Sequence, residues 1–393
     1  MKSSKHITLF THSFPYGLQE TFLETEILTL SNSFEKIIII PLEGQNGVAR
    51  NLPSNVSIKK PVFIDKSFIV LIQNFVKCFS NLLFIKHVII SIFNFRKLKQ
   101  IFIAITFDNY LRREQIPNDK NAIWYFYWGV NLASYLALIK IKPKTIVRFH
   151  GYDLYEERKS IPFRFQLLKN IDHAVCISEH GKSYLAKKYP EFSSKIKTFK
   201  LGTIDKTLAA NFSLSRNTFN IVSCSNVIPL KRVHLIASAL NHVSINLNWT
   251  HFGDGPNLDQ IKRQISNLQN NIRCFFPGRI PNNNVLEHYQ NNEVHLFINV
   301  SSSEGIPVSI MEAISFGIPV LATDINGNVE IVNNKNGLLV EKDINPYELG
   351  KKIQGLLLNP NYNSLRIEAR KKWEKEYSAE KNYQIFVKFL LEV

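Results

Sequence analysis

Residues 294–323 read VHLFINVSSSEGIPVSIMEAISFGIPVLAT. The runs VHLFINV and PVLAT at the two ends are almost continuously apolar, as strands covered on both faces must be. The segment between them predicts a loop followed by a helix. A strand, a helix and a second strand in this order form a βαβ unit, and such a unit predicts a parallel sheet.

The same alternation of short β-rich runs and longer helical patterns extends through both halves of the chain. We therefore predict an α/β protein with two doubly wound, Rossmann-like domains that face each other across a cleft, with ligands at the carboxyl ends of the strands. The predicted strands are residues 6–11, 36–41, 122–128, 145–150, 173–178 and 196–201 in the first half, and 219–224, 246–252, 272–276, 294–300, 319–323 and 337–340 in the second.

The length of 393 residues favours two domains over one. Both periodicities lapse in the polar stretch TIDKTLAANFSLSRNTF, which we interpret as the boundary. The predicted domains are residues 1–203 and 219–365, with a linker at 204–218. No repeat of 20–50 residues is visible within either half.

Composition and charge narrow the functional classes. Hydrophobic residues make up 45% of the chain and charged residues 20%, which is typical of a globular protein and not of a disordered one. The formal net charge of +16 favours an anionic partner, which includes nucleic acids, membrane surfaces and phosphorylated substrates. We find no signal peptide and no apolar run long enough to span a membrane.

The cysteines show no C-x-x-C spacing, so neither a zinc site nor a disulfide framework is predicted. Cys176, Cys224 and Cys274 lie in apolar, strand-like runs and are expected to be buried free thiols, and Cys78 lies elsewhere. This pattern favours a reducing cytosol.

Residues 62–113 interrupt the alternation of strands and helices. This segment is rich in Phe, Ile and Leu, and from Lys66 to Arg113 it contains eight Lys and Arg residues against one acid, Asp108. Such a basic amphipathic segment suits the interface of an anionic membrane. The alternative is a pair of ordinary helices facing the core. Nucleic-acid binding is disfavoured, because no recognition motif accompanies the aromatic residues.

Two carboxylates give the opening segment its chemical interest. Glu304 is expected in the loop at the carboxyl edge of the sheet, and Glu312 in the second turn of the helix. Pro307 suits the first helical turn, and Gly305 lets the backbone approach a ligand. The free N–H groups of residues 306–309 then form an anion site. A sugar, a diphosphate and a ribose would fit this arrangement in that order, and the alternative is a solvated helix stripe with a loop acid beside it.

Several motifs in the same order resemble those of the retaining glycosyltransferases of family 4, which have the GT-B fold. The resemblance covers nearly the whole chain. It rests on the E-x7-E pattern of SEGIPVSIME and the following EAISFGIPVLATDINGNVEIV, and on five further segments: HFGDGP (251–256), FFPGRI (275–280), VIPLKRVHLIASAL (227–240), RFHGYDLY (148–155) and THSFPYGLQETF (11–22).

The resemblance implies roles for residues on the donor side. Glu304 would bind the hydroxyls of the donor sugar, Glu312 those of the ribose, and Lys231 the diphosphate. The anion site inferred above from residues 306–309 agrees with this, because a phosphoryl leaving group needs fixed positive charge and oriented N–H donors. The other donor-side residues implied are Gly305, Ile306, Pro307 and Val308 after Glu304, and Gly278 and Arg279 near the nucleotide base.

On the acceptor side, the resemblance places His150 at the reaction centre, where it would donate to the transferring sugar. His150, Glu304 and Lys231 are therefore the predicted catalytic residues. Asp153 is expected to hold the loop of His150, and Gly17 and Glu20 to border the acceptor. The C-terminal segment 366–393 would form a helix that crosses back to the first domain.

Two positions depart from the family pattern. Asn226 stands where an Arg is common, and Arg232 is a candidate to compensate for it. The first loop, FPYGLQETF, has one glycine instead of a pair. No D-x-D motif occurs in the chain, so no metal site and no cofactor are predicted beyond a UDP- or GDP-linked sugar as co-substrate.

We therefore predict a retaining, metal-independent glycosyltransferase. The predicted acceptor is a lipid-linked or surface-polysaccharide precursor or an oligosaccharide, and the predicted location is the cytoplasm, peripheral on the inner face of an anionic cell membrane, with no nucleic-acid partner. The rivals are a nucleotide-sugar epimerase of the same fold, which needs no acceptor, and a non-catalytic sugar- or membrane-binding scaffold.

Overall fold

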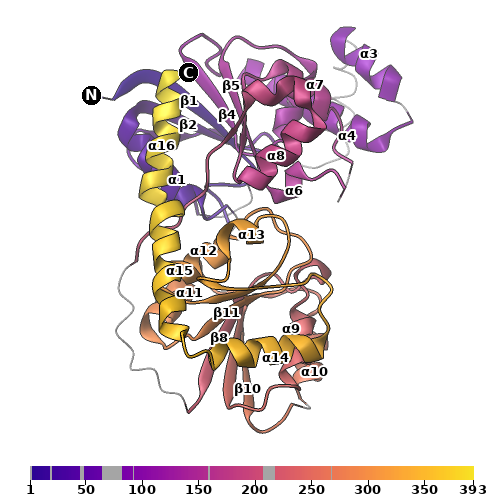
Figure 1. Cartoon of the computed structure of the whole chain (residues 1–393). Helices are drawn as coiled ribbons and strands as arrows, with labels where there is room; N and C mark the ends of the chain where they lie inside the picture. Colours follow the sequence, from indigo (N-terminus) through magenta and orange to yellow (C-terminus); the bar gives the residue numbers. More distant parts are fainter. Residues whose placement is uncertain are drawn as a thin grey trace. The chain divides into compact units, whose positions relative to one another are not determined.

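The computed structural model describes residues 2–17, 20–44, 48–63, 82–91, 93–157, 160–206, 217–266 and 268–393. The chain divides into two compact units, which we call the first and the second domain. The first domain contains Met1–Lys200 and Tyr383–Val393, and the second contains Leu201–Asn382. Each domain is an α/β unit with its own sheet (Figure 1).

The first domain is built on a seven-stranded parallel sheet with the order β3-β2-β1-β4-β5-β6-β7. Its strands are β1 (Ser3–Thr11), β2 (Phe34–Pro41), β3 (Val56–Ile58), β4 (Ala122–Phe126), β5 (Lys144–Phe149), β6 (His173–Cys176) and β7 (Ile196–Thr198). Its helices are α1 (Leu23–Ser33), α3 (Leu82–Ser91), α4 (Phe95–Arg113), α5 (Ser134–Leu138), α6 (Gly151–Leu154), α7 (Arg164–Asn170) and α8 (Glu179–Lys188), with 3-10 turns η1 (Asn131–Ala133) and η2 (Pro190–Lys195).

Successive residues of β4 face opposite sides of this sheet, which explains why the strand is apolar throughout. Trp124 and Phe126 pack into one core with residues of α4, α5, α7 and α8. Ile123 and Tyr125 pack into another with residues of α1 and of the last helix, α16 (Ala379–Glu392). The sheet is therefore covered on both faces (Figure 1).

The second domain has a six-stranded parallel sheet with the order β10-β9-β8-β11-β12-β13. Its strands are β8 (Phe219–Cys224), β9 (Leu247–Phe252), β10 (Ile272–Gly278), β11 (Leu296–Asn299), β12 (Val320–Thr323) and β13 (Gly337–Val340). The helices are α9 (Val233–Leu240), α10 (Leu258–Ile265), α11 (Asn282–Asn291), α12 (Val308–Ser315), α13 (Asn328–Ile331), α14 (Pro346–Leu357) and α15 (Tyr362–Glu376), with the 3-10 turn η3 (Pro229–Lys231). Helices α9, α10 and α14 share one core with the sheet, and α11, α12 and α15 lie on its other side (Figure 1).

The structure confirms the predicted α/β class and all twelve predicted strands, and it adds β3, a short strand at the edge of the first sheet. The two domains meet in sequence at residues 200 and 201. Most of the predicted linker, residues 207–216, lies outside the described residues. The C-terminal segment is two helices, and only its part from Tyr383 onward belongs to the first domain.

In the described part of segment 62–113, one portion is an ordinary core helix, and the interpretation as a membrane interface stays a prediction. Residues 64–81 lie outside the described residues. Helix α4 packs into the core from Ile101 onward, and Ile101 and Phe107 are fully buried. In contrast, Ile90 on α3, Phe93 in the following turn and Phe95 at the start of α4 are exposed. Among the described residues, no helix has both the length and the apolar character needed to cross a bilayer.

The prediction of buried thiols holds for Cys176, which is fully buried, but is wrong for Cys224 and Cys274, which are partly exposed. Cys274 lies on β10, the edge strand, where one side of the strand has no neighbour. Cys224 is the last residue of β8. Cys78 lies outside the described residues.

Candidate functional site

Each sheet reverses its strand order at one point, between β1 and β4 in the first domain and between β8 and β11 in the second. In open parallel sheets, ligands bind outside the carboxyl ends of the strands at this reversal, because the loops there diverge to opposite faces. The predicted site residues Lys231 and Glu304 follow β8 and β11, and His150 follows β5, the neighbour of β4.

Glu304 is held by three donors at the carboxyl end of β11. Its Oε1 atom accepts hydrogen bonds from Lys231 Nζ at 2.5 Å, Ser301 Oγ at 2.7 Å and Asn299 Nδ2 at 3.2 Å. The side chain of Glu304 is buried, and a charge in such a place must be paired. Among the residues that the structure describes, all hydrogen bonds to this carboxylate fall on Oε1, and Oε2 has no partner.

The loop of Glu304 is tied to the loop of Lys231 by backbone bonds. Ser302 donates through its backbone N–H and its hydroxyl to the carbonyl of Leu230, at 2.9 and 3.2 Å. Gly327 packs against the other side of the Glu304 loop, where an added Cβ would lie 1.9 Å from the carbonyl oxygen of Gly305. Only glycine permits this approach. The loop of Glu304 is therefore held by the loop of Lys231 and by the segment of Gly327.

Helix α12 begins one residue later than expected. Pro307 has an extended ψ of 113° and precedes the helix, so its placement in the first helical turn is corrected. The N–H groups of Gly305, Ile306, Val308 and Ser309 make no hydrogen bond within the described part of the chain. These N–H groups form the positive end of the dipole of α12, which lies next to the loop of Glu304. An anion is therefore favoured there.

Glu312 is buried, which contradicts the alternative of a solvated helix stripe. Its side chain is 8% exposed, and Ser315 on the same helix is also buried. Asn282 at the start of α11 donates its Nδ2 to Glu312 Oε1 at 2.8 Å. Burial raises the pKa of Glu312 to about 7, against the lowering effect of the Asn282 hydrogen bond and of Lys206.

The position that departs from the family pattern, Asn226, has an arginine for a partner. Arg279 at the end of β10 donates Nη2 to Asn226 Oδ1 at 2.8 Å. The preceding Gly278 has a φ of 77°, a conformation that favours glycine, and this residue turns the chain toward the loop of Asn226. A guanidinium is thus present beside position 226, although it comes from another strand end.

The Gly-Asp-Gly-Pro turn packs against the backbone of the loop that contains Asn226. A Cβ on Gly253 would lie 1.8 Å from the carbonyl oxygen of Ser225, and one on Gly255 would lie 2.4 Å from that of Val227. Gly253 also has a φ of 144°. The two glycines of this motif are therefore required by backbone packing between the ends of β8 and β9.

The guanidinium of Arg232 bonds to backbone carbonyls. Its Nε donates to Val300 at 2.7 Å, and its Nη1 donates to Lys342 at 2.6 Å. These bonds hold the start of α9 against the end of β11. A phosphate contact by Arg232 stays a prediction, and Arg279 is the cation that lies beside Asn226.

His150 lies in an aromatic cluster at the carboxyl end of β5. Its ring centroid is 4.4 Å from that of Trp128 and 4.9 Å from that of Tyr127. The side chain is 6% exposed, and its Nε2 atom has no hydrogen-bond partner within the described residues. Burial and the nearby Arg148 hold the pKa of His150 well below its usual range. The ring is therefore neutral at pH 7, and neither of its two nitrogens has a hydrogen-bond partner within the described residues.

Asp153 ties the loop of His150 to the end of β4. Its two carboxylate oxygens accept from the backbone N–H groups of His150, at 2.6 Å, and of Gly129, at 2.5 Å. Arg164 donates to its backbone carbonyl. Burial raises the pKa of Asp153 to about 6, although Arg164 and the backbone bonds oppose this.

Glu20 organises the loop after β1. Its carboxylate accepts from the backbone N–H groups of His12, Ser13 and Phe14 at 3.0, 2.8 and 2.7 Å, and from Trp128 Nε1 at 2.6 Å. This clamp places Trp128 against His150. Gly17, the other residue expected at the acceptor, has a φ of 68°. Its carbonyl oxygen accepts a hydrogen bond from Arg50 Nη2 at 2.6 Å.

Some residues of the site were missed by the sequence analysis. Asn299 and Ser301 lie five and three residues before Glu304, and their polar side chains at the end of an apolar strand were a usable signal. Trp128 and Asn282 gave no signal, because their contacts with Glu20 and Glu312 join distant parts of the chain. Within the described ranges, no group of three or more His, Cys, Asp or Glu side chains is arranged to hold a metal ion.

The second domain is similar in sequence to known glycosyltransferases. Residues 206–377 match the family described as "Glycosyl transferases group 1". This region is a glycosyltransferase group 1 domain. The chain is 29% identical over 251 residues to protein CapJ of Staphylococcus aureus, which covers 60% of each chain. It is 38% identical over 101 residues to the O-antigen biosynthesis glycosyltransferase WbnH of Escherichia coli, which covers 25% of this chain and 27% of WbnH.

The group 1 domain and the first domain together have a known fold. The crystal structure of Anabaena HepE in complex with UDP and glucose aligns with a TM-score of 0.66 at 14% identity, over 98% of this chain and 100% of HepE. The order of strands and this likeness show the GT-B fold, as predicted. The sequence alignments span at most 60% of the two curated relatives, CapJ and WbnH.

Proposed function

We propose that the protein is a retaining glycosyltransferase that moves a sugar from a UDP-sugar to a precursor of a surface polysaccharide. The observation that carries the proposal is the arrangement around Glu304 in the group 1 domain. A carboxylate with one free oxygen, a lysine and free helix N–H groups meet at the switch point of the sheet. The name of WbnH and the ligands of HepE support the substrate class.

In this proposal each group has a chemical role. The bond between the anomeric carbon and the diphosphate oxygen breaks, the acceptor oxygen forms a bond to that carbon from the same face, and the proton of the acceptor hydroxyl passes to the departing diphosphate oxygen. Lys231 and the N–H groups at the start of α12 stabilise the charge that develops on the departing diphosphate. Glu304 binds the sugar hydroxyls through its free oxygen, and Glu312 accepts from the ribose hydroxyls.

His150 would donate a hydrogen bond to the transferring sugar. Its unpartnered Nε2 and its neutral ring suit a donor that orients a hydroxyl without adding charge. Asp153 and Glu20 act on the reaction indirectly, because they position His150 and Trp128. They are therefore positioning residues in this proposal.

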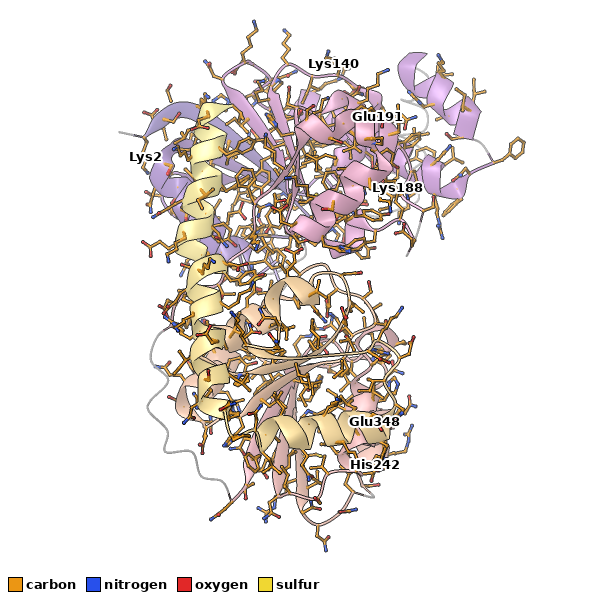
Figure 2. All side chains as sticks on the ribbon, in the orientation of Figure 1. Lys2, Lys140, Lys188, Glu191, His242 and Glu348 are labelled. Carbon is orange, nitrogen blue, oxygen red and sulfur yellow. The ribbon has the colours of Figure 1, made fainter. Side chains whose placement is uncertain are left out.

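The test is titration of UDP and of GDP, by calorimetry, into wild type, Glu304→Gln, Glu312→Ala and the control Glu348→Ala. Glu348 is exposed on α14 and lies in the same domain (Figure 2). We expect UDP to bind the wild type and the control equally, and Glu312→Ala to weaken binding about tenfold or more, since buried hydrogen bonds to hydroxyls are lost. Equal UDP affinity in all four proteins would overturn the donor site.

Retention is tested separately with UDP-α-glucose. In the absence of an acceptor, slow transfer to water should release glucose first as the α anomer, which proton NMR resolves before mutarotation. Release as the β anomer would show inversion. Conversion to another nucleotide sugar with no release of free sugar would instead establish the epimerase.

We further propose that the acceptor is lipid-linked and that the protein binds the surface of an anionic membrane. The described part of segment 62–113 supports this, because Phe93 and Phe95 are exposed by 103% and 81%. Residues 82–99 contain four Lys and Arg and no Asp or Glu. Apolar side chains beside unopposed cations are what anionic lipid attracts.

The membrane proposal is tested by sedimentation with vesicles that contain phosphatidylglycerol. The double variant Phe93→Ser/Phe95→Ser should lose most of its binding, whereas the control Leu28→Ser/Ile385→Ser, at exposed sites of α1 and α16, should retain it. Unchanged binding of the first variant, or an equal loss in the control, would count against this surface.

A further inference from the structure

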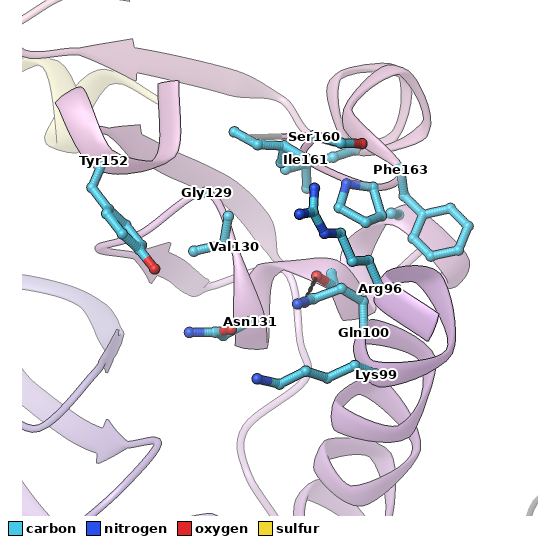
Figure 3. A pocket seen from close by; sticks show the side chains of 14 residues that line it. Arg96, Lys99, Gln100, Gly129, Val130, Asn131, Tyr152, Ser160, Ile161 and Phe163 are labelled. Carbon is cyan, nitrogen blue, oxygen red and sulfur yellow. Dashed lines mark hydrogen bonds between the residues drawn. The ribbon is translucent and has the colours of Figure 1, made fainter. Parts of the chain in front are cut away.

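The first domain contains a cavity of about 250 Å³ beside the His150 cluster, which we call the α4 pocket (Figure 3). Arg96 and Lys99 line it from the first turns of α4, and Asn131, Tyr152 and Ser160 line it from other segments. Pockets for drug-sized ligands usually measure about 300–1,000 Å³. The α4 pocket therefore suits a single small group, such as a phosphate with part of the sugar or chain that it carries.

The lining of the α4 pocket is basic. None of its lining residues is an Asp or a Glu. Arg96 and Lys99 are three residues apart on α4, so they present their charges on one face of the helix. Neither forms an ion pair with any residue that the structure describes. The acids nearest in sequence to Ser160 are already engaged, because Glu156 bonds to Tyr189 and Lys188, and Glu157 bonds to Tyr184.

The pocket also offers neutral groups that hydrogen-bond to a phosphate or a hydroxyl. In Figure 3 the side chains of Arg96 and Lys99 rise from α4, and Asn131 and Tyr152 lie across from them. Asn131 has a positive φ of 58°, so the chain turns sharply where it enters the pocket. Gln100 accepts from Ser134 at 2.7 Å, and this bond braces α4 against α5.

A short stretch of chain connects the α4 pocket to His150. Trp128, whose ring contacts that of His150, is followed by Gly129 and Val130, which line the pocket. Gly129 is fixed by its bond to Asp153, the residue that also holds the backbone of His150. A group bound in the pocket is thus adjacent to the predicted reaction centre of this domain, on the side where α4 begins.

The chain that leads into the pocket is exposed and apolar. Phe95 immediately precedes Arg96 and is 81% exposed, and Phe93 lies two residues before it. A ligand whose phosphate binds Arg96 therefore has apolar surface next to its phosphate. Few classes of ligand join these two properties, and a lipid phosphate is one of them.

From these observations we propose that the α4 pocket binds the phosphate by which the acceptor saccharide is linked to its lipid. Arg96 provides a planar pair of donors and Lys99 a compact charge, which together match the oxygens of a phosphate ester. This inference rests on the proposed function for the identity of the acceptor. The phosphate site itself depends only on the first domain.

The test is calorimetric titration of the full-length protein with geranyl phosphate, glucose 1-phosphate, inorganic phosphate and geraniol. Saturating UDP is present throughout, so that the donor site of the group 1 domain is not available to the probes. Wild type should bind geranyl phosphate, and Arg96→Ala/Lys99→Ala should bind it at least about tenfold more weakly, since two charge-assisted contacts are lost. The control is Lys140→Ala/Lys142→Ala, which removes two exposed lysines of the same domain outside the pocket, of which Figure 2 labels Lys140.

The outcomes separate the sources of the phosphate. Binding that depends on Arg96 and Lys99 and is tightest for geranyl phosphate supports a lipid phosphate, and the same dependence with glucose 1-phosphate tightest supports the site with a soluble sugar phosphate as its ligand. The proposal is overturned if no phosphate binds, if the control loses as much affinity as the pocket variant, or if geraniol binds as tightly as its phosphate.

The UDP titrations of the pocket variant distinguish this inference from the proposed function. Arg96→Ala/Lys99→Ala should bind UDP with wild-type affinity, because both residues belong to the first domain. Failure of UDP to bind the wild type would remove the glycosyltransferase and leave the phosphate site standing. Normal UDP binding without any binding of a phosphate probe would remove the α4 pocket alone.

Discussion

Glu304 and Glu312 lie on one strand–helix segment but in different electrostatic surroundings. Glu304 has a lysine within hydrogen-bond distance, whereas the hydrogen-bond partner of Glu312 is the neutral amide of Asn282. A buried carboxylate without a close cation loses hydration and gains little in return, so its proton is held more tightly. This explains why the pKa of Glu312 is raised to about 7.

The raised pKa of Glu312 predicts a pH-dependent cost to stability. Between pH 4.5 and 7 the unfolded chain has lost this proton and the folded chain keeps it, so stability falls as the pH rises through this window. A shift from 4.5 to about 7 corresponds to roughly 3 kcal/mol. Glu312→Gln removes this cost, and it should raise the melting temperature by several degrees at pH 8 and by much less at pH 5. An equal effect at both pH values would contradict the shift.

Arg279 is predicted to supply the guanidinium that position 226 lacks. Arg279→Ala should lower the affinity for UDP about tenfold, since a charge-assisted contact to the diphosphate is lost, and it should affect uridine little. The sharper test is rescue. In the Arg279→Ala background, Asn226→Arg should restore UDP affinity, because it returns the charge to the same place. If Asn226→Arg has no effect in that background, Arg279 acts elsewhere.

The residue scale also shows where prediction from sequence ends. Glu304, Lys231 and His150 could be selected because each lies in a segment that follows a strand and carries a recognisable pattern. The contacts of Arg279 with Asn226 and of Asn282 with Glu312 could not, because they join strand ends and helices that are 53 and 30 residues apart in the chain. Such contacts depend on the order of strands in the sheet, which local patterns do not specify.

At the scale of elements, a tight turn positions the loop of Asn226. The Gly-Asp-Gly-Pro turn has two glycines whose missing side chains leave room for the backbone of residues 225–227. The sequence located all but one of the strands, because strands covered on both faces give long apolar runs. It missed β3, a three-residue edge strand with no fully buried side chain, and it placed the start of α12 one residue early.

Gly253→Ala should therefore displace the loop of Asn226. The added Cβ would lie 1.8 Å from the carbonyl of Ser225, and the φ of 144° disfavours alanine even without this clash. We expect weaker UDP binding and a lower melting temperature. Gly355→Ala is the matched control, because Gly355 lies within α14 with open space around its Cα, and alanine there favours the helix by up to about 1 kcal/mol. A similar response to both substitutions would refute this account of the turn.

At the scale of the whole molecule, the two sheets share one topology without a visible repeat in sequence. Both have the order 3-2-1-4-5-6 when their strands are numbered from the start of each domain, and the first sheet adds a seventh strand. The parallel direction of the strands follows from the alternation of apolar strands and helices. Many unrelated sequences share this alternation. The alternation of elements could therefore be predicted from the sequence, whereas the equivalence of the two halves emerges only from the structure.

The last residues of the chain complete the core of the first domain. Phe386, Val387 and Leu390 pack with residues of α1 and of the first sheet. The ring of Phe386 lies 4.5 Å from the guanidinium of Arg148, which forms a fully buried ion pair with Glu26 at 2.6 Å. Truncation of this ring would remove apolar contacts and uncover a buried charge, so the cost should exceed that of an ordinary surface change.

Phe386→Ala should therefore destabilise the first domain, although the residue follows the group 1 domain in sequence. We expect a loss of about 3–5 kcal/mol, typical of a buried phenylalanine. The control is Ile385→Ala on the same helix, where the side chain is 59% exposed and the loss should be small. Hydrogen exchange followed by mass spectrometry locates the effect. Protection should fall in β1, β4 and β5 and stay unchanged in β8 and β11, whereas loss of protection in β8 and β11 alone would assign these last residues to the second domain.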